Sequence, residues 1–193
     1  MNTIIKLVAF LGNPGTQYRY NRHNAGWLFC DACTTFSTLS WKRGFKGVWA
    51  SFETQGGRVY CIKPETYMNL SGEAVHELAQ YYHIEREEIL VVHDELELPF
   101  GYAGLKFGGG LGGHNGLRSM NQHFKGADFW RLRIGIGRPE HADIAGYVLS
   151  NFPKTDLEIL SNTIFPAAEK LIAPVMRGEP LVLDKTNTKV KVT

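Results

Sequence analysis

Three of the seven histidines lie beside loop motifs, where an imidazole could act as a general base: His23, His93 and His114. An unperturbed imidazole has a pKa of about 6.5, so it can accept a proton from water near neutral pH. Asp94 could accept a hydrogen bond from one ring nitrogen of His23, which would leave the other nitrogen basic. A lone histidine is more often structural, and His93 at a strand end keeps that alternative. The favoured interpretation is hydrolysis by water that His23 and Asp94 activate.

Three asparagines from separate loops could hold a polar substrate: Asn13, Asn69 and Asn115. An asparagine amide both donates and accepts, so it can bind a peptide group or a developing oxyanion without adding charge. Each alone more often caps a turn. A parallel sheet would bring the three loops to one edge, where they would form a substrate site.

Other nucleophiles and metal ligands have little support. The sequence has no GxSxG motif for a serine nucleophile. Cys30 and Cys33 form a CxxC pair, but both fall in a helix predicted over residues 25–37, which favours core packing over redox chemistry. Cys61 stands alone, and the segment after His93 lacks the second histidine of an HExxH site. We therefore expect no metal and no cofactor.

A glycine-rich loop offers a second possibility, because Gly108, Gly110 and Gly113 satisfy GxGxxG. A dinucleotide site also needs an acidic residue about 20 positions further on. The only nearby acid, Asp128, follows after about 15 positions. A nucleotide-dependent oxidoreductase is thus the weaker alternative, although a phosphate bound by glycine amides stays open.

Positive charge is concentrated in one part of the chain, although the net charge is only +2. Residues 114–138 contain five basic residues and one acidic residue, namely Arg118, Lys125, Arg131, Arg133 and Arg138 against Asp128. Such a cluster suits a polyanion, and an ordinary solvated surface is the alternative.

The order of apolar segments predicts one α/β domain over residues 1–193. Residues 4–11 are apolar apart from Lys6 and are expected to form a central strand buried on both faces. Further strands are expected at residues 49–54, 58–63, 89–93, 102–107 and 129–137. Helices are expected at 71–83, with Ser71 as the cap, near 117–124, at 143–149 and at 156–176. Pro166 must start, kink or break the last of these helices. Residues 180–193 are expected to be a loosely ordered basic tail.

The apolar runs at residues 7–11 and 89–92 are too short to cross a bilayer, and no basic segment precedes the first. The expected location is therefore cytoplasmic, without membrane association.

Six short motifs and one tyrosine stand out along the chain. They are LGNPG at 11–15, Tyr18, RHNAG at 22–26, PETYMNLSG at 64–72, HDELELPFG at 93–101, LKFGGGLGGHNGLRS at 105–119 and FWRLRIGIGRP at 129–139. Together they resemble the motifs of the bacterial-type peptidyl-tRNA hydrolases. They stand in the family's order, and the similarity spans residues 4 to about 152.

The resemblance implies a monomeric α/β fold with a mixed, twisted sheet among helices. It implies hydrolysis, without metal or cofactor, of the ester between a peptide and the 3′ end of tRNA. The roles it implies are catalysis by His23 with Asp94 as its orienting partner, substrate binding by Asn13, Tyr18, Met68, Asn69, His114 and Asn115, and tRNA binding by Lys106 and Arg133.

The chain also departs from the family pattern. Ala9 and Phe10 stand where a glycine-containing pair is more usual, Gly104 stands where some members have lysine, and residues after about 154 are only loosely similar. A non-enzymatic RNA-binding protein on the same scaffold is the main rival, and the presence of His23 and Asp94 favours the enzyme. The glycines of residues 108–113 are hypothesised to form a mobile rim around the substrate.

Overall fold

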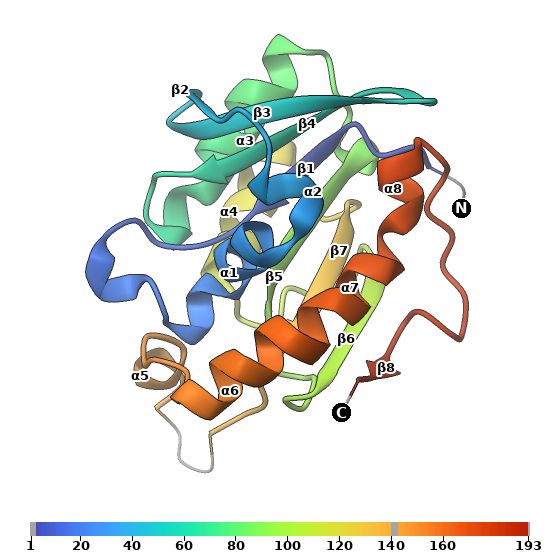
Figure 1. Cartoon of the computed structure of the whole chain (residues 1–193). Coiled ribbons are helices and arrows are strands. Elements are labelled where there is room, and N and C mark those ends of the chain that lie inside the picture. Colours follow the sequence, from blue (N-terminus) through green and yellow to red (C-terminus); the bar gives the residue numbers. More distant parts are fainter. Residues whose placement is uncertain (1–2, 140–142, 193) are drawn as a thin grey trace.

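The computed structural model describes residues 3–139 and 143–192, which form one mixed β-sheet with helices on both faces (Figure 1). The strand order is β2-β3-β4-β1-β5-β7-β6-β8. The strands are β1 (Leu7–Phe10), β2 (Lys42–Gly44), β3 (Gly47–Thr54), β4 (Gly57–Pro64), β5 (Ile89–Glu95), β6 (Tyr102–Phe107), β7 (Trp130–Gly135) and β8 (Val190–Lys191). The predicted α/β fold with a mixed sheet is confirmed.

The first strand lies in the middle of the sheet, as its apolar sequence predicts. All of β1 is buried, and it pairs in parallel with β4 on one side and β5 on the other. β7 continues the parallel part beside β5, whereas β2, β3, β6 and β8 pair in antiparallel fashion. The carboxyl ends of β1, β4, β5 and β7 therefore share one edge of the sheet, which is where open α/β sheets bind their ligands.

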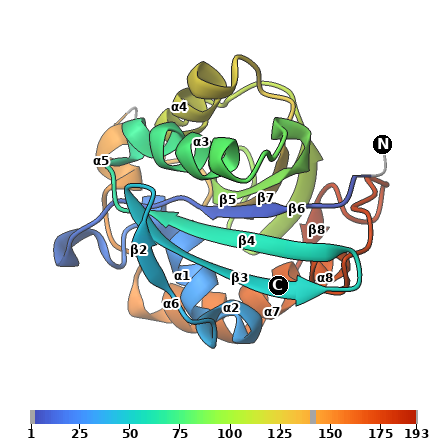
Figure 2. The same cartoon turned by 90° about the horizontal axis from the view of Figure 1, so that it is seen from above.

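Helices enclose the sheet from both faces, as the view from above shows (Figure 2). The α-helices are α1 (Ala25–Ala32), α2 (Thr34–Ser37), α3 (Ser71–Tyr81), α4 (Asn115–Phe124), α5 (Ile144–Val148), α6 (Lys154–Ile159), α7 (Phe165–Leu171) and α8 (Ala173–Arg177). Alternate side chains of β1 point to opposite faces of the sheet, so this strand contributes to the hydrophobic core on each face. Leu7 and Ala9 pack with α3 and α4, whereas Val8 and Phe10 pack with α1 and α7.

The helix predicted over residues 25–37 is interrupted. Cys33 adopts an extended conformation, with φ of −73° and ψ of 122°, between α1 and α2. The β-branched residues Thr34 and Thr35 follow, and such residues are poor helix formers. The predicted cap of α3 was also wrong, because Leu70 is the cap residue and the Ser71 hydroxyl donates to the Met68 carbonyl at 2.9 Å.

The helix predicted over residues 156–176 is divided into several segments. A π-helical turn, Leu160–Ile164, separates α6 from α7, and Pro166 lies in the first turn of α7. The backbone stays helical from the π-helical turn into α7, where the Phe165 N–H donates to the Leu160 carbonyl, so Pro166 follows a change of hydrogen-bond spacing within a continuous helical path. A second proline, Pro174, likewise lies in the first turn of α8.

The C-terminal segment, expected from its composition to be loosely ordered, is held against the sheet in this structure. Leu181 is buried, and its N–H donates to the carbonyl of Thr3. Val190 and Lys191 form β8, which pairs with Ala103 and Tyr102 of β6. Backbone pairing with a sheet edge requires no apolar pattern, so the composition did not indicate it.

Gly26 sets how closely α1 approaches the sheet. A Cβ atom at this position would lie 2.5 Å from the Val92 carbonyl oxygen and 2.6 Å from the Leu11 carbonyl oxygen. Gly26→Ala is therefore expected to lower the free energy of unfolding by about 2 kcal/mol or more, measured by urea denaturation. Gly110→Ala is the matched control, because nothing lies within 4 Å of a Cβ there. The control should change stability by about 0.5 kcal/mol or less, and equal losses in both variants would contradict the prediction.

Candidate active site

The candidate catalytic groups come from three elements that meet at the carboxyl edge of the sheet. His23 lies in a short 3-10 turn, Arg22–Asn24, which follows the loop after β1. Asp94 is the penultimate residue of β5. His114 is the cap residue at the start of α4. The parallel pairing of β1 with β5 therefore brings together residues that are far apart in the sequence.

His23 and Asp94 form a buried hydrogen-bonded pair. The Nδ1 atom of His23 lies 3.0 Å from both carboxylate oxygens of Asp94. Both side chains are almost fully buried. Because Asp94 occupies Nδ1, the Nε2 atom of His23 is the ring nitrogen left to act on a substrate.

Asp94 also accepts a hydrogen bond from His114, a contact that the sequence did not predict. The Nε2 atom of His114 lies 3.0 Å from Asp94 Oδ1. Its Nδ1 accepts from the backbone N–H groups of Gly116 and Leu117. Nδ1 therefore carries no proton, and Nε2–H is the donor to Asp94. The start of α4 thus determines the tautomer of His114.

The pKa values of Asp94 and His23 are shifted in opposite directions by their interaction. Burial alone would raise the pKa of Asp94, but the neighbouring His23 and His114 hold that pKa well below its usual range. Burial alone would lower the pKa of His23, but the charge of Asp94 and its hydrogen bond raise the pKa above the ordinary value. Asp94 therefore stays ionised, and His23 is a stronger base than a free imidazole.

His93 has a structural role. It is fully buried, and its Nδ1–H donates to the carbonyl of Asp94. Burial holds the pKa of His93 well below its usual range, and the neighbouring His114 lowers it further. The structural alternative considered for His93 is supported, and its neutral ring packs edge-on against that of His114.

Asn13 connects the loops around the site. Its Oδ1 accepts from the N–H of Met68 at 2.7 Å, so it ties the loop after β1 to the loop before α3. Asn24, for which the sequence suggested no role, completes the connection. Its Oδ1 accepts from Asn13 N at 2.8 Å, and its Nδ2 donates to Asn13 O at 3.0 Å. The only sequence signal for Asn24 was its place directly after His23.

The two remaining asparagines are exposed at the mouth of the site. Asn69 and Asn115 line a cavity of about 440 Å³ together with Asn13, Tyr18, His23, Tyr67, Met68, Ala145, Val148 and Leu149. The structure thus brings five of the six sequence-predicted substrate residues to one cavity, whereas His114 lines a neighbouring one. A second cavity of about 360 Å³, lined by Leu96, Gly112 and Arg118 among others, shares His23 and Asn115. His23 therefore lines both the 440 Å³ cavity and the 360 Å³ cavity.

Arg131 holds the glycine-rich loop. Its guanidinium is buried and donates to the carbonyls of Gly110 at 2.7 Å and Gly109 at 3.0 Å. Arg131 is therefore not available to an external polyanion, although the composition of residues 114–138 had placed it in the basic cluster. The loop follows β6, which runs antiparallel to β7, so it is not the crossover turn of a dinucleotide-binding βαβ unit. Movement of this loop stays a prediction.

One group of possible metal ligands occurs among the described residues. His23, Asp94 and His114 offer three ligand atoms within 4.8 Å of one another. Both histidines already hydrogen-bond to Asp94, so a metal ion held by all three side chains would compete with these bonds. Chemically the site can therefore act either as a base held by a carboxylate or as a three-ligand metal centre.

The cysteines do not contribute to a site. All three are free and buried, and burial raises the pKa of Cys33 to about 12 and that of Cys30 still further. A thiol with so high a pKa forms little thiolate at neutral pH, which supports core packing for the CxxC pair.

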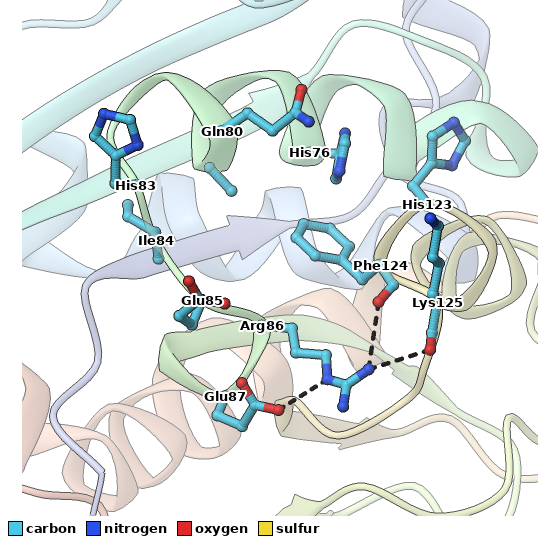
Figure 3. A pocket seen from close by; sticks show the side chains of 11 residues that line it. His76, Gln80, His83, Ile84, Glu85, Arg86, Glu87, His123, Phe124 and Lys125 are labelled. Atoms are coloured by element: carbon cyan, nitrogen blue, oxygen red, sulfur yellow. Dashed lines mark hydrogen bonds and ion pairs between the residues drawn. The ribbon is translucent and has the colours of Figure 1, made fainter.

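A further cavity, of about 620 Å³, lies at the far end of α3 and α4 (Figure 3). Its most prominent cation, Arg86, donates to the carbonyls of Phe124 and Lys125 and to the carboxylate of Glu87. These bonds satisfy the carbonyls at the end of α4, so Arg86 serves the fold. The cavity is separate from the His23 site, because α4 runs between them.

No helix in residues 3–139 and 143–192 has the length and apolar character needed to cross a membrane.

Residues 7–192 match the family model described as peptidyl-tRNA hydrolase. The chain belongs to the peptidyl-tRNA hydrolase family. The peptidyl-tRNA hydrolase of Trichlorobacter lovleyi is 42% identical over 190 residues, which cover 98% of this chain and 97% of the relative. That of Treponema pallidum is 52% identical over 153 residues, which cover 77% and 76%. These matches confirm the family, and with it the class of hydrolases, that the motifs indicated.

A solved structure supports the fold independently. The crystal structure of peptidyl-tRNA hydrolase from Acinetobacter baumannii superposes with a TM-score of 0.77 at 34% identity, covering 92% of this chain and 95% of that one. The similarity therefore includes most of the region after residue 154, where the motifs were weakest.

Replacing Asp94 by asparagine tests the electrostatic coupling within the pair. The variant removes the charge that raises the pKa of His23 but leaves the imidazole buried. We expect the pKa of His23 to fall below about 6.5 in Asp94→Asn, because desolvation then dominates. NMR titration of the imidazole resonances measures the change, and His76 in the middle of α3, which lines a separate cavity, serves as an unchanged internal reference. A His23 pKa that stays the same or rises would contradict this account.

Proposed function

We propose that this chain hydrolyses the ester bond between a peptide, or an N-blocked amino acid, and the 3′ end of tRNA, using water activated by His23. The observation that carries the proposal is the buried pair itself, in which Asp94 binds Nδ1 of His23 and leaves Nε2 beside the cavity of Asn69 and Asn115. Family membership supplies the substrate class.

In the proposed reaction His23 Nε2 takes a proton from water as the water oxygen attacks the ester carbonyl. Asp94 stabilises the resulting imidazolium through Nδ1–H. The tetrahedral intermediate then collapses, the bond to the 3′ ribose oxygen breaks, and the imidazolium returns its proton to that oxygen. The products are a free peptide carboxylic acid and tRNA. Because the base must be neutral, the rate is expected to rise with pH through the pKa of His23.

The exposed asparagines would select the acyl part of the substrate. Asn69 and Asn115 are placed to hydrogen-bond a peptide amide and the oxygen that becomes negative, while Tyr18 and Met68 line the same cavity. A free α-amine cannot make the bonds of an amide, so aminoacyl-tRNA would be a poor substrate. A non-catalytic RNA-binding role is the second candidate, and the intact His23–Asp94 pair favours the enzyme.

For the tRNA part of the substrate, Lys106 and Arg133 are proposed to contact phosphates. They lie on neighbouring strands and on one face of the sheet, since Lys106 pairs with Arg131 and Gly104 pairs with Arg133. Contacts to phosphate carry no sequence information, so many tRNAs would be accepted. We further propose that the enzyme acts as a monomer in the cytoplasm, where it recycles tRNA from peptidyl-tRNA that ribosomes release.

Release of labelled N-acetylated amino acid from tRNA tests the activity directly. The wild-type protein is expected to catalyse release, and His23→Ala to lower the rate by ~10²–10⁴-fold, the usual contribution of a general base. His76→Ala is the control, because His76 lies at the separate cavity between α3 and α4. Equal rates for the wild type and His23→Ala would refute the mechanism, and no release by the wild type would refute the function.

The metal-free mechanism has its own test, because His23, Asp94 and His114 also form a potential metal site. Protein stripped with a strong chelator, and checked for metal by mass spectrometry, is expected to keep its full rate of release. Loss of activity that a single divalent metal ion restores would contradict this mechanism and assign the three side chains to a metal centre.

A further inference from the structure

The C-terminal strand β8 extends a basic face of the sheet. Directly opposed residues in antiparallel strands share a face, and so do residues two positions apart. Arg133 opposes Gly104 on β6, and Tyr102 on the same face of β6 opposes Lys191 of β8. Lys189 directly precedes β8, and its ammonium lies over the Tyr102 ring, which places it beside this face. The face therefore carries Lys106, Arg133 and Lys191 in neighbouring strands, with Lys189 beside it.

Gly104 allows the C-terminal segment to lie there. A Cβ atom at residue 104 would be 2.2 Å from the carbonyl oxygen of Thr188 and 3.1 Å from the Cα of Lys189. The N–H of Leu105 donates to the carbonyl of Asn187 at 2.7 Å, and Arg133 donates to the carbonyl of Thr188. The backbone of residues 187–189 thus occupies the space that any larger side chain at position 104 would fill.

The charges near this face are mostly positive and mostly accessible. Lys189 and Lys191 are exposed, and the Lys189 ammonium lies 5.0 Å from the centre of the Tyr102 ring. Asp184 is the acid of the same segment, and its carboxylate accepts from the backbone N–H groups of Thr186 and Asn187 in a local turn. Glu95 on β5 is the other nearby acid, and it lowers the net charge without cancelling it.

We propose that β8 is part of the RNA-binding surface, with Lys189 and Lys191 contacting phosphates of the tRNA that Lys106 and Arg133 also hold. The inference rests on the proposed function and assigns it two further residues. The segment takes one donor of Arg133 for the Thr188 carbonyl but brings two exposed ammonium groups to the same face. Its net effect is thus to strengthen the attraction for a polyanion.

The double variant Lys189→Ala/Lys191→Ala tests the assignment by binding of intact tRNA across a range of salt concentrations. We expect affinity to fall on the order of tenfold or more near 0.1 M salt, and the slope of log K against log salt to fall by about 2. Hydrolysis of a minimal N-acetyl-aminoacyl nucleotide should be unchanged. Lys42→Ala/Lys170→Ala removes the same charge from the far sheet edge and from α7, and should bind tRNA like the wild type.

The variant Gly104→Ala keeps every charge and tests whether the C-terminal segment must lie against β6 for tRNA to bind. Because its Cβ collides with Thr188, the variant is expected to release the segment, seen as faster tryptic cleavage after Lys185 and Lys189, and to bind tRNA more weakly. Tighter binding by either variant would overturn the proposal and make the segment a cover over Arg133. Affinity of the double variant equal to that of its charge-matched control would also overturn it. If the wild type neither bound nor hydrolysed peptidyl-tRNA, the proposed function itself would fail.

Discussion

The arrangement of the site depends on one buried carboxylate, Asp94, held between two imidazoles. A buried charge is costly unless hydrogen bonds and opposite charge compensate it. Two N–H donors, from His23 and His114, meet this requirement within 3.0 Å. The donor from His114 exists because backbone N–H groups at the start of α4 bind its other nitrogen. The start of α4 thus fixes the tautomer of His114. The Nε2–H of His114 then stabilises the carboxylate of Asp94, and that carboxylate orients the imidazole of His23.

The loops that carry these groups are joined to one another as well as to the sheet. Asn13 bonds to Asn24 on one side and to Met68 on the other, so the turn of His23 and the loop of Asn69 share one polar connection. Gly26 brings the start of α1 against the backbone of β1 and β5. If His23 acts as the proposed base, contacts of this kind would leave it little reorganisation to undergo on substrate binding, which is the general advantage of a preorganised site.

Basic residues near the site divide into internal and external ones. Arg131 is buried and serves the carbonyls of the glycine-rich loop. Arg86 serves the end of α4 in the same way. The cations proposed to bind a nucleic acid, Lys106, Arg133 and Lys191, lie on the neighbouring strands β6, β7 and β8. Charge density along the sequence therefore overstated one region and did not indicate that Lys191 of β8 pairs beside Tyr102 of β6.

Motifs and apolar periodicity are local properties of the chain, so they were enough to predict the family, the α/β class, the central place of β1 and the pairing of His23 with Asp94. The second partner of Asp94, the connecting role of Asn24, the inward direction of Arg131 and the docking of β8 became visible only in the folded chain. The break at Cys33 and the π-helical turn before Pro166 also emerged only there, although the sequence had predicted that Pro166 would start, kink or break a helix. Each of these depends on which distant backbone group a donor meets, and hydrogen-bond direction in a folded chain leaves no signature in local composition.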